Sequence, residues 1–179
     1  MQDALLVIDV VSEFGHEDGD RLLTSFRERL QALRAAIAIC RARGVPVIYV
    51  NDRHGRWDGD VPRLLRDALS GAGGDVVSAV APRKGEPFLL KSRYSAFDHT
   101  GLELLLGELG VERVLLAGGT TEGCIVQTGI DGRELGLKVT IVEPACATID
   151  RDLEQTALRY AKSVAGIYIA ASLDELAGV

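Results

Sequence analysis

Short apolar runs alternate with longer segments of helical periodicity along this chain. Six runs predict β-strands: residues 4–10, 45–51, 88–91, 113–119, 138–143 and 166–171. Residues 22–43 form the clearest helix, with one apolar stripe made by Leu23, Phe26, Leu30, Leu33, Ile37 and Cys40. Further helices are expected at residues 61–70, 102–109 and 153–164, after Thr120 and at the C-terminal end. Residues 144–148, which include Cys146, are expected to form a loop.

This alternation of strands and helices predicts the α/β class. We expect a three-layer α/β/α sandwich around a six-stranded, mainly parallel sheet with strand order 3-2-1-4-5-6. The chain has 179 residues and no internal repeat, and its most linker-like stretch, residues 71–74, is too short to separate domains. A single domain over residues 1–179 is therefore expected.

Composition narrows the class of partner. The net charge is −6 and the pI is about 5.1, which argues against nucleic acid and anionic membranes as partners. No apolar run has membrane-spanning length, and the first apolar run follows no basic region. Three cysteines without a CxxC pair indicate neither a disulfide framework nor a cysteine metal site. A cytosolic, soluble protein is expected.

Three polar residues stand where strands end. Asp9 closes the first strand, Lys91 closes the third, and Cys124 follows the fourth after two glycines. In the expected sheet these ends meet at the crevice where ligands bind in such folds. A thiol in the first turn of a helix is favoured as thiolate by free N–H groups. Taken singly, each residue has a plainer explanation as a cap, a surface lysine or a buried core thiol.

Other candidates lie in the loops. Asp52 and His54 stand two apart after the second strand and are a weak candidate metal pair. Phe14, Trp57, Tyr94 and Thr121 are expected to shape a substrate pocket. His16 is expected to be an exposed loop residue. Trp57 could equally cover the core as a lid instead of lining a pocket.

Three segments resemble the isochorismatase-like cysteine hydrolase superfamily, which includes nicotinamidases and N-carbamoylsarcosine amidohydrolases. They are LLVIDVVSEF with Asp9, LLKSRYSAF with Lys91, and LLAGGTTEGCIVQT with Cys124. The resemblance implies an Asp9–Lys91–Cys124 catalytic triad and a cis peptide bond between Gly119 and Thr120. It also implies an oxyanion site at the backbone N–H groups of Thr120 and Cys124.

The sequence also departs from the family pattern. Val11 stands where family members often carry Gln, and no His lies between His54 and His99 to complete a nicotinamidase-type metal site. We therefore expect no metal and no other cofactor. The isochorismate-cleaving branch lacks the nucleophile, so Cys124 argues against that reaction.

The expected function is a cysteine hydrolase that cleaves an amide, carbamoyl or ureido C–N bond of a small molecule through a thioester. Two alternatives stay open: a catalytically silent binding protein on the same scaffold, and a redox-responsive thiol protein in which Cys146 approaches Cys124. The partner is expected to be a small amide substrate, and a homo-oligomer is expected. The sequence does not identify the substrate.

Overall fold

The fold is organised around one six-stranded sheet, which a computed structural model describes together with the rest of residues 2–177. Its strands are β1 (Asp3–Ile8), β2 (Val47–Asp52), β3 (Phe88–Lys91), β4 (Arg113–Gly119), β5 (Lys138–Ala147) and β6 (Tyr168–Ala170). Their order is β3-β2-β1-β4-β5-β6, and every neighbouring pair is parallel. The expected fold class and strand order are confirmed, with an all-parallel sheet in place of a mainly parallel one.

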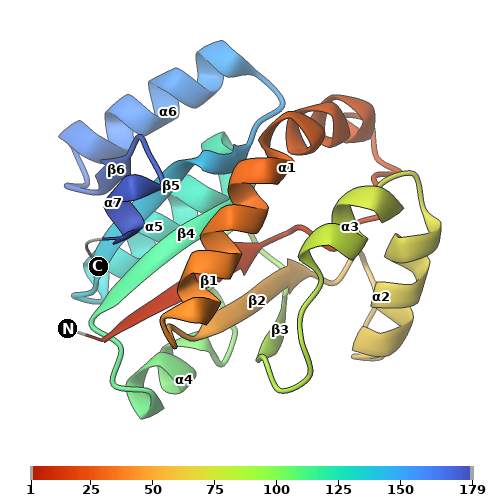
Figure 1. Cartoon of the computed structure of the whole chain (residues 1–179), viewed down its shortest axis with the longest axis horizontal. Coiled ribbons are helices and arrows are strands. Elements are labelled where there is room, and N and C mark those ends of the chain that lie inside the picture. The colour runs from red at the N-terminus through yellow and green to blue at the C-terminus, as the bar shows by residue number, and fades with distance from the viewer. Residues whose placement is uncertain (1, 178–179) are drawn as a thin grey trace.

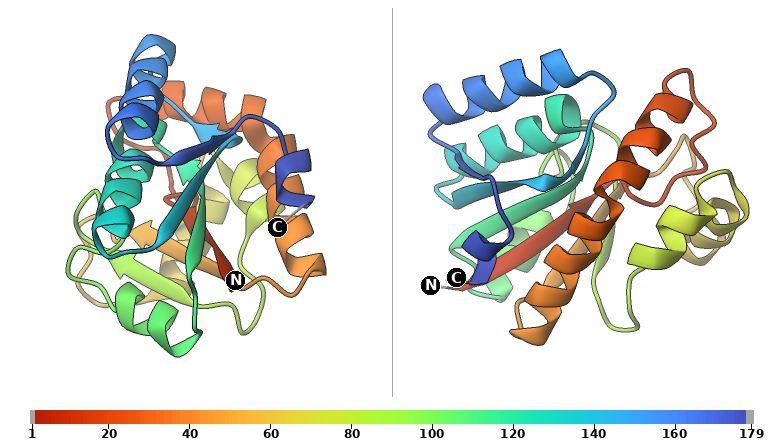
Figure 2. Two further views of the ribbon diagram at one scale, coloured as in Figure 1. Left: turned by 90° about the vertical axis from the view of Figure 1, so that its left-hand side faces the viewer. Right: turned by 45° about the horizontal axis from the view of Figure 1, so that its top comes forward.

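Helices cover both faces of this sheet, as Figures 1 and 2 show. One face carries α1 (Gly19–Ala42), α2 (Val61–Ser70), α3 (Gly74–Val80) and the short α7 (Asp174–Ala177). The other face carries α4 (Leu102–Glu108), α5 (Val126–Glu134) and α6 (Arg151–Ser163). The helices make the two outer layers of the sandwich.

Strand β1 shows how the pattern of the sequence produces two cores. All six of its residues are buried. Leu5 and Val7 pack under α1, whereas Leu6 and Ile8 pack under the opposite helices. Successive side chains of a strand point to opposite faces, so a continuous apolar run is what a strand covered on both faces requires.

Two local predictions were wrong, and one helix was missed. Strand β5 continues through Ala147, so Cys146 lies in the sheet and not in a loop. Helix α3 follows the glycine-rich stretch and is too short for periodicity to reveal. A single π-helical turn, Thr121–Ile125, stands between β4 and α5 where the first turn of an α-helix was expected.

The structure describes slightly less than the expected domain. Met1 and residues 178–179, which the expected domain includes, lie outside the described part. Within residues 2–177, none of the helices is long and apolar enough to cross a membrane.

Candidate active site at the carboxyl ends of the strands

Asp9 lies directly after β1, where the chain leaves the sheet. Its φ of +53° is uncommon for a residue with a side chain and turns the carboxylate toward the neighbouring strand ends. Oδ1 accepts the backbone N–H of Asp52 at 2.6 Å, and Oδ2 contacts Lys91 Nζ at 2.8 Å. Both oxygens are therefore held, one by β2 and one by β3.

Asn51 fixes the same chain segment from β2, and the sequence prediction did not find it. It is buried, its Oδ1 accepts the Val11 N–H, and its Nδ2 donates to the Val11 carbonyl, both at 2.9 Å. The amide thus takes the place of a backbone partner for a residue just beyond Asp9. A polar residue inside an apolar strand was the available signal, since buried amides need such partners.

Lys91 sits at the end of β3 with its side chain almost fully buried. Its Nζ contacts Asp9 Oδ2, donates to the Arg93 carbonyl at 2.9 Å, and lies 3.3 Å from Cys124 Sγ. An ammonium has three N–H groups, and these three partners can engage all of them. Burial by itself lowers the pKa of Lys91, but the charges of Asp9 and Cys124 outweigh it and raise the pKa above its ordinary value.

Cys124 is placed by the turn after β4. At Gly118, with φ +119°, an added Cβ would lie 2.0 Å from the Ile8 carbonyl oxygen, so only glycine lets β4 pass this close to β1. The Gly119–Thr120 peptide bond is cis. The π-helical turn follows, with the Ile125 N–H donating to the Thr120 carbonyl at 3.1 Å.

The protonation of Cys124 differs from the expectation. Burial and the negative charge of Asp9 raise the pKa of the thiol to about 12, and Lys91 opposes them only in part. At neutral pH the resting site is thus a neutral thiol beside an Asp9–Lys91 ion pair. Free N–H groups at the helix start were expected to favour the thiolate, whereas burial and the facing carboxylate act in the opposite direction.

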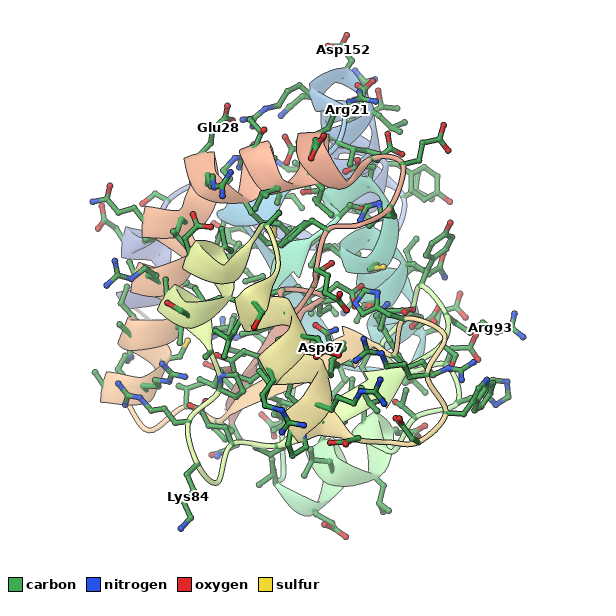
Figure 3. The ribbon with its side chains drawn as sticks, turned by 90° about the vertical axis from the view of Figure 1, so that its right-hand side faces the viewer. Arg21, Glu28, Asp67, Lys84, Arg93 and Asp152 are labelled. Atoms are coloured by element: carbon green, nitrogen blue, oxygen red, sulfur yellow. The ribbon has the colours of Figure 1, made fainter. Side chains whose placement is uncertain are left out.

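A cavity of about 630 Å³ opens in front of these groups. Its walls combine the strand ends with two loops: Asp9, Ser12, His16, Leu22, Asp52, His54, Lys91, Ser92, Arg93, Tyr94, Gly119, Thr120 and Cys124. Tyr94, which was expected to shape a substrate pocket, lines this cavity. The Arg93 side chain points outward from the body of the molecule (Figure 3).

Three residues expected in this pocket lie elsewhere. Phe14 turns inward and packs edge-to-face on Phe26 of α1, because burying its ring stabilises the loop. Trp57 is 84% exposed and stacks under the guanidinium of Arg53. Thr121 is fully buried at the start of the turn, where its hydroxyl donates to Glu154 Oε1 at 2.9 Å and lies 3.1 Å from the Ala147 carbonyl.

The Asp52–His54 pair does not fit a metal site. Asp52 Oδ1 accepts the His54 backbone N–H at 2.5 Å, and His54 Nε2 faces the Val11 carbonyl at 3.3 Å. His16 reaches the same cavity. Even so, residues 2–177 bring together no group of three His, Cys, Asp or Glu side chains able to hold a metal ion.

Comparison with known proteins agrees with this arrangement. Residues 3–172 match the isochorismatase domain. The chain belongs to the isochorismatase family. The match spans all six strands and all three residues of the Asp9–Lys91–Cys124 cluster, so the suspected superfamily is confirmed.

Relatives within the family differ in activity. The chain is 30% identical over 148 residues to maleamate amidohydrolase of Pseudomonas putida, covering 78% of this chain and 69% of that protein. It is 29% identical over 156 residues to a probable inactive nicotinamidase of Arabidopsis thaliana, covering 80% of each. The crystal structure of N-carbamoylsarcosine amidase from Thermoplasma acidophilum matches with a TM-score of 0.71 at 28% identity, covering 94% of this chain and 95% of that one. Such relatives support an amide-cleaving hydrolase as the general class.

Proposed function

We propose that this isochorismatase-family chain hydrolyses the C–N bond of a small amide, carbamoyl or ureido compound through a Cys124 thioester. The observation that carries the proposal is the position of Lys91 Nζ, 2.8 Å from Asp9 Oδ2 and 3.3 Å from Cys124 Sγ. A nucleophile, a base and a cation meet at the wall of one cavity. Maleamate amidohydrolase and N-carbamoylsarcosine amidase, by name, act on such bonds.

The first step moves a proton from the thiol to the carboxylate. Asp9 pairs with Lys91, which also contacts Cys124, and takes the thiol proton as Sγ attacks the carbonyl carbon. The developing thiolate is stabilised by the Lys91 ammonium at 3.3 Å. Backbone N–H groups of Thr120 and Cys124 hold the oxyanion, and each such donor contributes about 3–4 kcal/mol in known cases.

The second half returns the proton and releases the acid. Asp9 protonates the leaving ammonia or amine, which breaks the C–N bond and leaves a thioester on Cys124. Water then attacks the thioester carbonyl while Asp9 accepts a proton from it. The C–S bond breaks and Asp9 passes that proton to Sγ, which reforms the thiol, releases the acid product and leaves Asp9 as the carboxylate.

The two alternatives fit less well. A silent binding protein, as the name of the Arabidopsis relative suggests for that protein, has no need of a buried acid–lysine–thiol cluster. A redox pair with Cys146 is disfavoured because Cys146 is fully buried within β5, where its thiol faces the Leu116 carbonyl. A cytosolic location and a homo-oligomer stay predictions.

An ammonia-release screen over primary amides and ureido acids tests the proposal. At least one compound should be turned over by the wild type and not by Cys124→Ala. Because residues that act in one step are strongly non-additive, Asp9→Asn with Cys124→Ala should lose little more than Cys124→Ala alone. Turnover that survives Cys124→Ala would overturn the mechanism.

A further inference from the structure

Glu154 on α6 is a buried carboxylate that the proposed chemistry does not use. Its side chain is fully buried, an environment that carboxylates almost never occupy without a partner. Arg29 of α1 supplies that partner, with Nη2 donating to Glu154 Oε2 at 3.0 Å, and Arg151 lies 3.4 Å from the same oxygen. One oxygen is thus neutralised by arginines from two helices.

The other oxygen reaches the turn that carries the nucleophile. Thr121 Oγ1 donates to Glu154 Oε1 at 2.9 Å and lies 3.1 Å from the Ala147 carbonyl. Thr121 is the first residue of the π-helical turn, three residues before Cys124. The contact connects α6 directly to the start of this turn.

A second tie holds the same turn from the same side. Glu122 Oε1 accepts the Ile149 N–H at 3.0 Å, and Gly119 pairs with Ala147 in the sheet. Arg29 also donates through Nη1 to the Glu143 carbonyl at 2.7 Å, so it braces β5 as well as Glu154. The turn is thereby fixed to the β5–α6 connection along its whole first half.

We propose that Glu154 is a positioning residue, which acts through Thr121 to hold the Thr121–Ile125 turn where Cys124 meets Asp9 and Lys91. This inference rests on the proposed function for its effect on turnover. A displacement of about 1 Å at a reacting atom can cost about 100-fold in rate. Cys124 Sγ stands 3.3 Å from Lys91 Nζ, so a small shift of the turn breaks that contact.

The ion pair with Arg29 does not by itself require a contact with the turn. A buried ion pair can often be replaced as a whole by apolar side chains without loss of stability, whereas removing one partner leaves the other charge uncompensated. Leucine at position 154 would leave Arg29 without a carboxylate, and the Thr121 hydroxyl would keep only the Ala147 carbonyl. Thr121→Val removes the contact between Glu154 and the turn while leaving the ion pair in place.

The test uses Thr121→Val and Glu154→Gln, which are nearly isosteric with the native residues. For the amide found by the screen, kcat should fall about 10- to 100-fold while KM changes less than about threefold. In parallel, iodoacetamide labelling of Cys124 at pH 7.5 should become at least about threefold faster, because a loosened turn exposes a thiol whose pKa burial had raised. Thr121→Ser keeps the hydroxyl and should restore both values.

Two control variants remove a buried hydroxyl and a carboxylate charge at sites away from the Thr121–Ile125 turn. Thr140→Val removes a buried hydroxyl from the start of β5, and Glu86→Gln removes the half-buried partner of Arg41. Glu86→Gln should lower the melting temperature, because it removes the charged partner of Arg41. Neither variant should change kcat or Cys124 labelling.

The outcomes separate the two proposals. Unchanged labelling and unchanged kcat in Thr121→Val would overturn the positioning role, whether or not Glu154→Gln folds. If the wild type turns over no amide, the proposed function fails, and the labelling rates alone still decide whether Glu154 holds the turn. A fall in melting temperature with no other change would show that Glu154 is only structural.

Discussion

Removing the charge of Asp9 should make Cys124 more reactive while abolishing turnover. The pKa of the thiol is raised first by burial and then by Asp9, whereas Lys91 lowers it. In Asp9→Asn the negative charge is gone, and the buried Lys91 ammonium is left with uncharged partners: the new amide oxygen, the Arg93 carbonyl and the Cys124 thiol. An uncompensated buried cation is unfavourable, so the pKa of Cys124 should fall and a larger fraction of the thiol should be ionised beside Lys91.

The expected change in labelling rate follows from the fraction of Cys124 that is ionised before and after the substitution. With a pKa of about 12, only about 3 in 10⁵ wild-type thiols are ionised at pH 7.5. Burial, the largest cause of the raised pKa, stays in Asp9→Asn, so only the part due to Asp9 is lost. Each pKa unit lost raises the thiolate fraction about tenfold, and the less basic thiolate is about threefold less nucleophilic. Labelling should therefore become about threefold faster for each unit by which the pKa falls.

The assay follows iodoacetamide adducts by peptide mass mapping at pH 7.5, together with ammonia release. Asp52→Asn is the matched control, since Asp52 lines the same cavity but binds the His54 backbone and not the thiol. Its labelling should equal that of the wild type. Equal or slower labelling in Asp9→Asn would show that Asp9 does not hold the proton on Cys124, and the reasoning on the resting state would be refuted.

Two further predictions concern metal and pH. Dialysis against a chelator should leave ammonia release unchanged, because Asp52 Oδ1 is engaged by the His54 backbone N–H and His54 Nε2 by the Val11 carbonyl. Activity that is lost and then restored by zinc, iron or manganese would contradict this. Stability should fall above about pH 8.5, because Cys40, Cys124 and Cys146 have raised pKa values in the folded state and the unfolded chain loses these protons first. For three thiols, the free energy of unfolding falls by up to about 4 kcal/mol per pH unit. Between pH 8 and pH 10, urea unfolding of Cys124→Ser should show a loss of unfolding free energy about one third smaller than that of the wild type.

The sheet and the cluster at its edge could be predicted because both follow from local pattern. A run such as β1, apolar at every position, has to be covered on both faces. Parallel strands then bring their carboxyl ends to one edge, so Asp9 and Lys91 become neighbours although 82 positions separate them in the sequence. No knowledge of the loops is needed for that step.

The pocket walls could not be predicted because loop side chains choose their direction by tertiary packing. Phe14 and Trp57 are both aromatic loop residues, yet one packs in the core and the other lies 84% exposed. Glu154 carries no signal either, since its position on α6 is ordinary for an exposed helical residue. Only the fold shows that it points at Thr121.

Different residues are expected to carry out the reaction and to select the substrate. Lys91 uses all three N–H groups within the protein, and both oxygens of Asp9 are held by Lys91 and Asp52. The polar groups of the cluster are therefore largely engaged within the protein and in the proposed proton transfers. Selection falls to the cavity wall, where Tyr94 and Arg93 follow β3 and are exposed. Exchanging these rim residues should change which amide is accepted, whereas exchanging Asp9 or Lys91 should stop the reaction for every amide.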